Sequence, residues 1–138
     1  SSQLAFYDVK DIKILGTSLW NSPYLLKQGA EYLEGAVFPD SFFISSFYPE
    51  TNNFVDIFYT AYGRDPENIE ALSYDTARIV FSVLENQGIQ TRRELVAALM
   101  RLENYMGATG NISFSPDRVA QKIPFILRIK NGKLEQVK

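Results

Sequence analysis

The sequence contains neither cysteine nor histidine. Without cysteine the chain has no disulfide, no thiolate nucleophile and no cysteine-ligated metal site. Without histidine it lacks the commonest general base and the commonest metal ligand, and a Ser-His-Asp triad is impossible. Any catalysis would depend on carboxylates, lysines or tyrosines alone. The composition therefore predicts a protein that is not an enzyme, with no catalytic residues, no metal site and no cofactor.

Long apolar runs and clustered positive charge are also missing. No run approaches the roughly 20 apolar residues that a membrane-spanning helix requires. The formal net charge is −2, and no group of basic residues interleaved with aromatic residues marks a nucleic-acid surface. The sequence therefore predicts no nucleic-acid partner.

Carboxylates are present, but their placement indicates no reaction centre. Glu31 and Glu34 stand three residues apart directly before a predicted strand, where helical spacing does not hold. Asp75 lies in a predicted helix, and we interpret it as one half of an ordinary ion pair with Arg78 or Arg64.

What the chain does contain fits an α/β fold. Its 138 residues are 46% hydrophobic and 14% aromatic, enough for a substantial core. β-branched or alternating runs favour strands, and apolar residues three and four apart favour helices. Three central helices are expected between strands at both ends. Strands are predicted at residues 12–15, 35–38, 110–114, 122–130 and 133–137, and helices at 50–63, 68–87 and from Thr91 onward, with the end of another helix at 4–9.

Proline and the apolar pattern give further expectations about packing. The strand at 12–15 is predicted to be buried, and Pro39 is predicted to break the strand at 35–38. Residues 39–49 are then extended rather than helical. Apolar residues surround much of the helix at 68–87, which indicates burial on more than one side.

Caps and turns are the clearest local signals, and Gly63 is expected to end the helix at 50–63. Ser22 and Pro23 begin a helix that Gly29 makes short or split. Thr91 is the expected N-cap of the third helix, and Glu94 completes a capping box. Asn131-Gly132 between two alternating runs predicts a hairpin turn.

Five segments occur in an order that resembles one known family. They are Ile14–Thr17, Tyr32–Val37, Phe54–Pro66, Ser73–Ala77 and Gly107–Phe114. Together they resemble the type I periplasmic solute-binding proteins, the group that includes branched-chain amino-acid receptors of ABC transporters. The resemblance implies a partial periplasmic-binding-protein type I fold, with Rossmann-like lobes.

A second, narrower resemblance rests on three segments. Phe6–Val9, Gly16–Asn21 and Glu34–Asp40 resemble the penicillin-binding protein activator branch, whose members are bacterial lipoproteins. Both resemblances imply a location in the bacterial periplasm or cell envelope. They leave open whether the partner is a membrane permease or a cell-wall synthase.

The resemblance implies that residues 1–138 are a C-terminal fragment of a two-lobed domain. The sequence begins with Ser1 rather than a methionine, as expected for a piece of a longer polypeptide. Residues 12–38 and 109–137 would belong to the second lobe, and residues 50–103 to the first. The first lobe's sheet would then be missing. Because large uncovered apolar faces tend to associate, we expect a homodimer or a swapped assembly of this fragment.

Four residues are candidates for ligand binding. Ser18, Trp20 and Asn21 follow the end of a predicted strand, where α/β sheets place ligands. Ser18 and Asn21 would hydrogen-bond the ligand, and Trp20 would form an apolar wall. Tyr74 would reach the cleft between lobes. In the alternative interpretation Asn21 caps the helix at Pro23, Trp20 packs, and the Tyr74 ring is part of the core.

The resemblance implies a non-catalytic receptor of an ABC-type uptake system that holds a small polar, amino-acid-like molecule between two lobes. Ser18 departs from the family pattern, since amino-acid receptors of this family commonly place an acidic residue in this loop. The alternative is a regulatory domain of the penicillin-binding protein activator type that acts by protein-protein contact.

Overall fold

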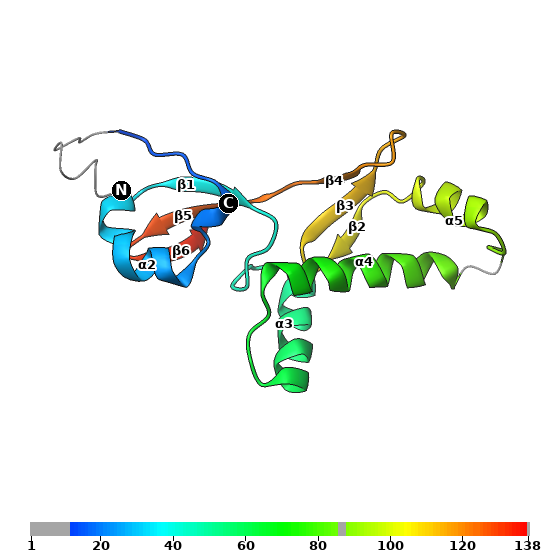
Figure 1. The fold of residues 1–138 in the computed structure, drawn as a ribbon, viewed down its shortest axis with the longest axis horizontal. Helices are drawn as coiled ribbons and strands as arrows, with labels where there is room; N and C mark the ends of the chain where they lie inside the picture. Colours follow the sequence, from blue (N-terminus) through cyan, green and yellow to red (C-terminus); the bar gives the residue numbers. More distant parts are fainter. Residues whose placement is uncertain (1–11, 86–87, 138) are drawn as a thin grey trace. The chain divides into compact units, whose positions relative to one another are not determined.

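Contacts divide the chain into two compact units in the computed structural model, which describes residues 12–85 and 88–137. Unit 1 combines Ser1–Ser41 with Pro124–Lys138, and unit 2 is Phe42–Ile123. Both units contain helices and strands, so the predicted α/β class is confirmed (Figure 1). The helix end expected at residues 4–9 lies outside the described residues.

Unit 1 is built on a three-stranded antiparallel sheet with the order β1-β5-β6. Phe125, Leu127 and Ile129 alternate along the middle strand and are buried, as expected for one face of a sheet packed on a core. The elements of unit 1 are the 3-10 helix η1 (Ser18–Trp20), α2 (Pro23–Gly29), the 3-10 helix η2 (Ala30–Leu33), β1 (Val37–Asp40), β5 (Phe125–Lys130) and β6 (Lys133–Gln136).

Two predictions in unit 1 are confirmed by local geometry. The helix that begins at Pro23 splits at Gly29, after which the chain tightens into η2. Asn131 and Gly132 have φ values of 51° and 73° and join β5 to β6. Positive φ at both central residues is the requirement of a type I′ hairpin turn.

The expected buried strand at residues 12–15 is wrong. Its pairing is a single bridge between Leu15 and Val37. Gly16 N–H donates to the Val37 carbonyl, and Val37 N–H donates to the Ile14 carbonyl. Leu15 is 79% exposed. Alternation alone could not reveal this, because a β-branched run is buried only where neighbouring strands or helices cover it.

The predicted break at Pro39 is also wrong. β1 continues through Pro39, which lies opposite Ile126, to Asp40. Because β1 is an edge strand of this sheet, a residue without an N–H can stand in it without removing a hydrogen bond of the ladder.

Unit 2 contains three helices and a second three-stranded antiparallel sheet with the order β2-β3-β4. Gly63 closes the first helix in the left-handed conformation, and Thr91 caps the third, with Glu94 completing the capping box, as predicted. The elements are α3 (Pro49–Tyr62), α4 (Asn68–Leu84), α5 (Arg92–Leu99), β2 (Tyr105–Gly107), β3 (Gly110–Phe114) and β4 (Ala120–Lys122).

The strand predicted at 122–130 is two strands in different units. β4 ends at Lys122 and β5 begins at Phe125, with Ile123-Pro124 between them. Pro124 lacks a backbone donor, which favours an interruption of pairing. β3 and β4 pair within unit 2.

The core of unit 2 centres on Phe54 of α3. Its ring lies 6.0 Å from Phe42 and 4.7 Å from Tyr74, and Ala71 and Ala108 complete the buried cluster. Phe42 belongs to the segment at 39–49, which is not helical before Pro49, as predicted. After Asp40 this segment contains a turn rather than a strand.

One face of α4 is buried, whereas burial on more than one side was expected. Ala71, Asp75, Ile79 and Val83 are buried along one stripe. On the rest of the helix, Ile69 is 66% and Phe81 is 63% exposed. Within the described part of the chain, nothing covers this second apolar stripe.

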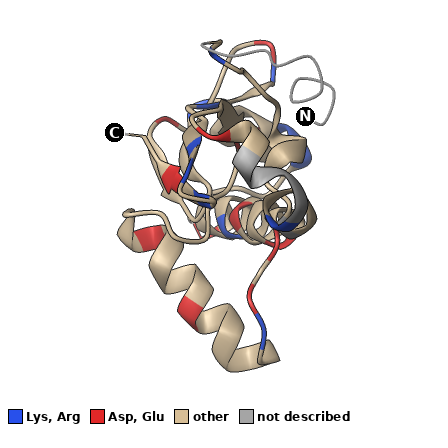
Figure 2. Cartoon of the chain, turned by 90° about the vertical axis from the view of Figure 1, so that its left-hand side faces the viewer, with Lys and Arg blue, Asp and Glu red and all other residues tan. Residues whose placement is uncertain are grey.

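α3 presents a similar uncovered surface. Glu50 and Asp56 are its only charged residues (Figure 2), and Ile57 and Tyr62 are exposed.

No helix among the described residues has the length and apolar character needed to cross a membrane.

Candidate functional site

Trp20 lies against the core of unit 1, from the end of η1. Its ring packs edge-on against Phe38 with 6.3 Å between centroids, and it is partly buried. A side chain at Gly16 would overlap the Trp20 ring, so the glycine is required for this position of the tryptophan. The packing matches the alternative interpretation of Trp20 and leaves part of its surface accessible.

Asn21 ties η1 to the end of β1. Its Nδ2 donates to Oδ2 of Asp40 at 2.7 Å, and Oδ1 of the buried Asp40 accepts from Ser41 N–H at 2.6 Å. The backbone of Ser22 opens α2, because its carbonyl accepts from Leu26 N–H at 3.1 Å. The Asn21 side chain therefore positions the loop.

Ser18 is exposed at the start of η1. Its carbonyl accepts from Asn21 N–H at 3.0 Å, whereas its hydroxyl has no hydrogen-bond partner among residues 12–85 and 88–137. The Ser18 hydroxyl is therefore available to a ligand.

Tyr74 lies in unit 2 and combines a packed ring with a polar tip. The ring contacts Phe54, as the alternative interpretation expected, and its hydroxyl accepts from Nη1 of Arg78 at 3.1 Å. The Arg78 guanidinium also lies 5.6 Å from the centre of the Tyr74 ring. Hydrogen bonding to Tyr74 and then to Tyr105 raises the pKa of Arg78 and favours its charged form.

A pocket of about 100 Å³ opens beside this tip. It is more polar than apolar, and Arg78 supplies its positive charge. Its walls are Glu50, Asn53, Tyr74, Asp75, Arg78, Tyr105, Met106, Gly107 and Ala108.

The four candidate ligand residues lie in different units of the chain. Ser18, Trp20 and Asn21 belong to unit 1, and Tyr74 belongs to unit 2.

Asp75 is the buried anchor of the turn between β2 and β3. Its Oδ1 accepts from Ala108 N–H at 2.7 Å, and its Oδ2 accepts from the N–H and the hydroxyl of Thr109 at 2.8 and 2.5 Å. Thr51 donates to the Ala108 carbonyl at 2.8 Å. A Cβ on Gly107 would lie 2.5 Å from the Asp75 carboxylate, which explains the glycine.

The ion pair expected for Asp75 is wrong. Arg64 pairs instead with Glu70 on the exposed surface, and Arg78 pairs with the tyrosine hydroxyl described above. Asp75 is satisfied by hydrogen bonds to a turn that lies more than thirty residues away in sequence. The sequence does show an aspartate within a helical segment and a Gly-x-Thr-Gly turn. Sequence spacing alone could not connect the two.

The polar chain extends from Asp75 through Thr109 to Lys122. Nζ of the half-buried Lys122 donates to Oγ1 of Thr109. Burial lowers the pKa of Lys122, and the negative charge of Asp75 opposes that effect. Among the described residues, no group of three or more acidic side chains is arranged to hold a metal ion.

Comparison with known proteins gives one family and a consistent fold. A family described as "Periplasmic binding protein" matches residues 2–133. A branched-chain amino acid ABC transporter structure from Rhodospirillum rubrum is similar at 27% identity and a TM-score of 0.88, over 96% of this chain and 39% of that chain. No curated protein sequence matches significantly.

Two further solved structures share the fold. A leucine binding protein from Thermotoga maritima is 25% identical with a TM-score of 0.72, over 99% of this chain and 39% of that one. A branched-chain amino acid substrate binding protein from Streptococcus pneumoniae, in complex with isoleucine, is 24% identical with a TM-score of 0.68, over 96% of this chain and 39% of that one. The chain thus spans well under half the length of the proteins it resembles.

Proposed function

This chain belongs to the periplasmic binding protein family, and on that premise we propose that it forms part of the solute-binding receptor of an ABC-type uptake system. The observation that carries the proposal is the similarity to the R. rubrum transporter structure across 96% of the chain. The family and the similar structures are binding proteins rather than enzymes, so the proposed role is non-catalytic. Family membership implies an extracytoplasmic location, and we propose the bacterial periplasm or cell envelope.

The proposal assigns the chain to both lobes of a longer receptor. Residues 12–38 and 109–137 would contribute to the second lobe, and residues 50–103 to the first. The exposed stripe of α4 with Ile69 and Phe81 supports this division, because such a stripe in a complete receptor would pack on the rest of the first lobe. In the isolated chain the same stripe would pack on a second copy, as a homodimer or swapped assembly.

The proposed ligand is a small polar, amino-acid-like molecule held between the lobes. The Ser18 hydroxyl, which has no partner in the part of the chain that the structure describes, and the accessible part of Trp20 would contact it from one lobe. Tyr74 would contact it from the other. A ligand that touches both lobes stabilises the closed state over the open state, so binding would shift the hinge equilibrium toward closure. A membrane permease would be the partner of the closed form.

A thermal-shift screen of the complete polypeptide that contains this chain tests the proposal. The panel contains the standard amino acids and small polar metabolites. A ligand at one hundred times its Kd adds about 2.7 kcal/mol to the free energy of unfolding, which corresponds to a rise in Tm of several degrees. Ser18→Ala should reduce the shift, whereas the matched control Ser45→Ala, an exposed serine of unit 2, should leave it unchanged.

A flat response to the whole panel would contradict the receptor proposal. Retention of the complete polypeptide by an immobilised penicillin-binding cell-wall synthase would then favour the alternative, a regulatory domain of the activator type that acts by protein-protein contact.

A further inference from the structure

Unit 2 contains an apolar cavity of about 250 Å³ between α4, α5 and the sheet β2-β3-β4. Most of its accessible lining is apolar. The apolar walls come from both helices and from β3, and they are Leu72, Ile79, Val80, Leu99, Ile112 and Phe114. All of these residues lie within Phe42–Ile123, so the cavity is a property of this unit alone.

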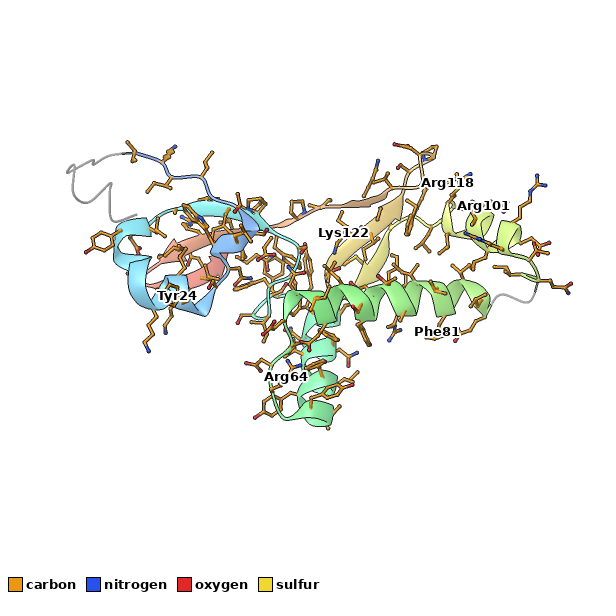
Figure 3. The ribbon with its side chains drawn as sticks, viewed as in Figure 1. Tyr24, Arg64, Phe81, Arg101, Arg118 and Lys122 are labelled. Carbon is orange, nitrogen blue, oxygen red and sulfur yellow. The ribbon has the colours of Figure 1, made fainter. Side chains whose placement is uncertain are left out.

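The lining of this mostly apolar cavity includes one cationic side chain. Lys122, labelled on β4 in Figure 3, lines the cavity. Its ammonium group donates to the neutral hydroxyl of Thr109 and forms no ion pair with a carboxylate in the described ranges. An ammonium group carries three donors, so two remain for another acceptor.

Asp75 also lines the cavity but does not neutralise Lys122 directly. Its two oxygens already accept three hydrogen bonds, from Ala108 N–H and from the N–H and hydroxyl of Thr109. The carboxylate is therefore committed to the turn, and Thr109 separates it from the ammonium group. Lys122 remains half-buried beside apolar side chains, and burial lowers its pKa.

We propose that this cavity binds a small molecule with an apolar body and a carboxylate head, with the carboxylate on Nζ of Lys122. The apolar body would lie against Ile79 and Ile112, which are buried at 5% and 4% exposure. The carboxylate would pair directly with a half-buried ammonium group whose neighbouring negative charge, on Asp75, lies beyond Thr109. Charge-assisted hydrogen bonds are among the stronger ones.

The volume fits a ligand of this size. An apolar cavity of about 150 Å³ is enough for benzene, whereas pockets for drug-sized ligands begin at about 300 Å³. A cavity of about 250 Å³ lies between these limits. Short-chain fatty acids are therefore suitable probes, and hexanoate is the one we choose.

This site is separate from the one in the proposed function. It uses no part of unit 1 and none of Ser18, Trp20, Asn21 or Tyr74. A negative result in the amino-acid screen would not contradict the hexanoate site. A negative result with hexanoate would not contradict the receptor proposal.

Methyl NMR of the 138-residue chain with hexanoate tests the site directly. Saturating hexanoate should shift the methyl signals of Ile79 and Ile112, whereas Ile129, buried in unit 1, should not move. 1-Hexanol and hexylamine carry the same apolar body with a neutral or positive head, and each should bind at least about tenfold more weakly. Unmoved Ile79 and Ile112 signals, or equal affinity for hexanol, would overturn the proposal.

Variants of the lysine provide the second readout. Lys122→Met should weaken hexanoate binding by about tenfold or more while the affinity for hexanol is kept. Lys122→Arg should restore most of the hexanoate affinity, and the exposed Lys133→Met is the matched control that should bind as the parent chain does. If Lys122→Met binds hexanoate as tightly as the parent chain, the carboxylate does not lie on Lys122. If that variant does not fold, the comparison of hexanoate with hexanol on the parent chain decides the question.

Discussion

Asp75 accepts two hydrogen bonds from Thr109, one from its backbone N–H at 2.8 Å and one from its hydroxyl at 2.5 Å. With the Ala108 N–H, these bonds fasten α4 to the turn between β2 and β3. Three buried donors therefore depend on one carboxylate that is 2% exposed. This arrangement links α4 to the second sheet and leads to direct predictions about stability.

Asp75→Ala should lower the free energy of unfolding by about 3 kcal/mol. The substitution leaves buried donors without an acceptor, and each unsatisfied buried group costs about 1–3 kcal/mol. Urea unfolding followed by circular dichroism measures the loss. Asp56→Ala, at an exposed acid on α3, should change stability by less than about 0.5 kcal/mol. Equal effects of the two substitutions would contradict the anchoring role of Asp75.

Gly107→Ala should destabilise the chain because the new Cβ would lie 2.5 Å from the Asp75 carboxylate. Overpacking of this kind typically costs about 1–3 kcal/mol. A double-mutant cycle measures the coupling, since in an Asp75→Ala background the clash is absent. The cost of Gly107→Ala should be clearly smaller in that background. Strict additivity of the two substitutions would refute the proposed contact.

Glu94 should contribute to stability in a pH-dependent way. Hydrogen bonds from the backbone N–H of Gln90 and from Thr91 lower the pKa of Glu94 below its ordinary value of 4.5. Its stabilising contribution is therefore present above the ordinary pKa and is lost as the pH falls through the lower folded-state pKa.

Urea unfolding of the parent chain and of Glu94→Gln, at about pH 6 and about pH 3, tests this dependence. The stability difference between the two proteins should be larger at the higher pH. Arg92→Gln, at the start of the same helix, controls for a general effect of surface charge. A difference that stays constant with pH would mean that ionised Glu94 does not stabilise the cap.

Such local signals were predicted from sequence because their partners are close along the chain. The capping box of Thr91 and Glu94, the left-handed Gly63 and the turn at Asn131-Gly132 each depend on about five consecutive residues or fewer. Their physics is therefore contained in a short window of sequence.

Long-range contacts account for what the sequence did not reveal. Asp75 meets Ala108 and Thr109 across separations of 33 and 34 residues, so nothing near Asp75 indicates its partners. β2 has only three residues, one of them a glycine, and pairs with β3 because the turn brings them together. The exposure of Leu15 likewise depends on which elements lie beside it.

The candidate ligand residues show the same limit. Their sequence positions predicted that Ser18, Trp20 and Asn21 share a loop, and they do. The hydrogen bond from Asn21 to Asp40 joins residues 19 apart, and the ring contact of Tyr74 with Phe54 is likewise long-range. Whether any of the four touches a ligand remains a prediction.

The uncovered stripe of α4 should make the isolated chain self-associate. Sedimentation velocity at tens of micromolar should show a dimer or larger species. Phe81→Glu places a charge in the stripe, where Phe81 is 63% exposed, and should shift the distribution toward monomer. Val119→Glu, at an exposed apolar residue outside α3 and α4, should leave the distribution unchanged. A parent chain that is only monomeric would count against the uncovered-stripe account.

The most direct test of the receptor account is small-angle X-ray scattering from the complete polypeptide, with and without the most stabilising compound of the amino-acid panel. A two-lobed receptor that closes on its ligand predicts a decrease in the radius of gyration, which should be weaker for Ser18→Ala at the same ligand concentration. An unchanged radius of gyration at saturating ligand would contradict closure of two lobes around a bound solute.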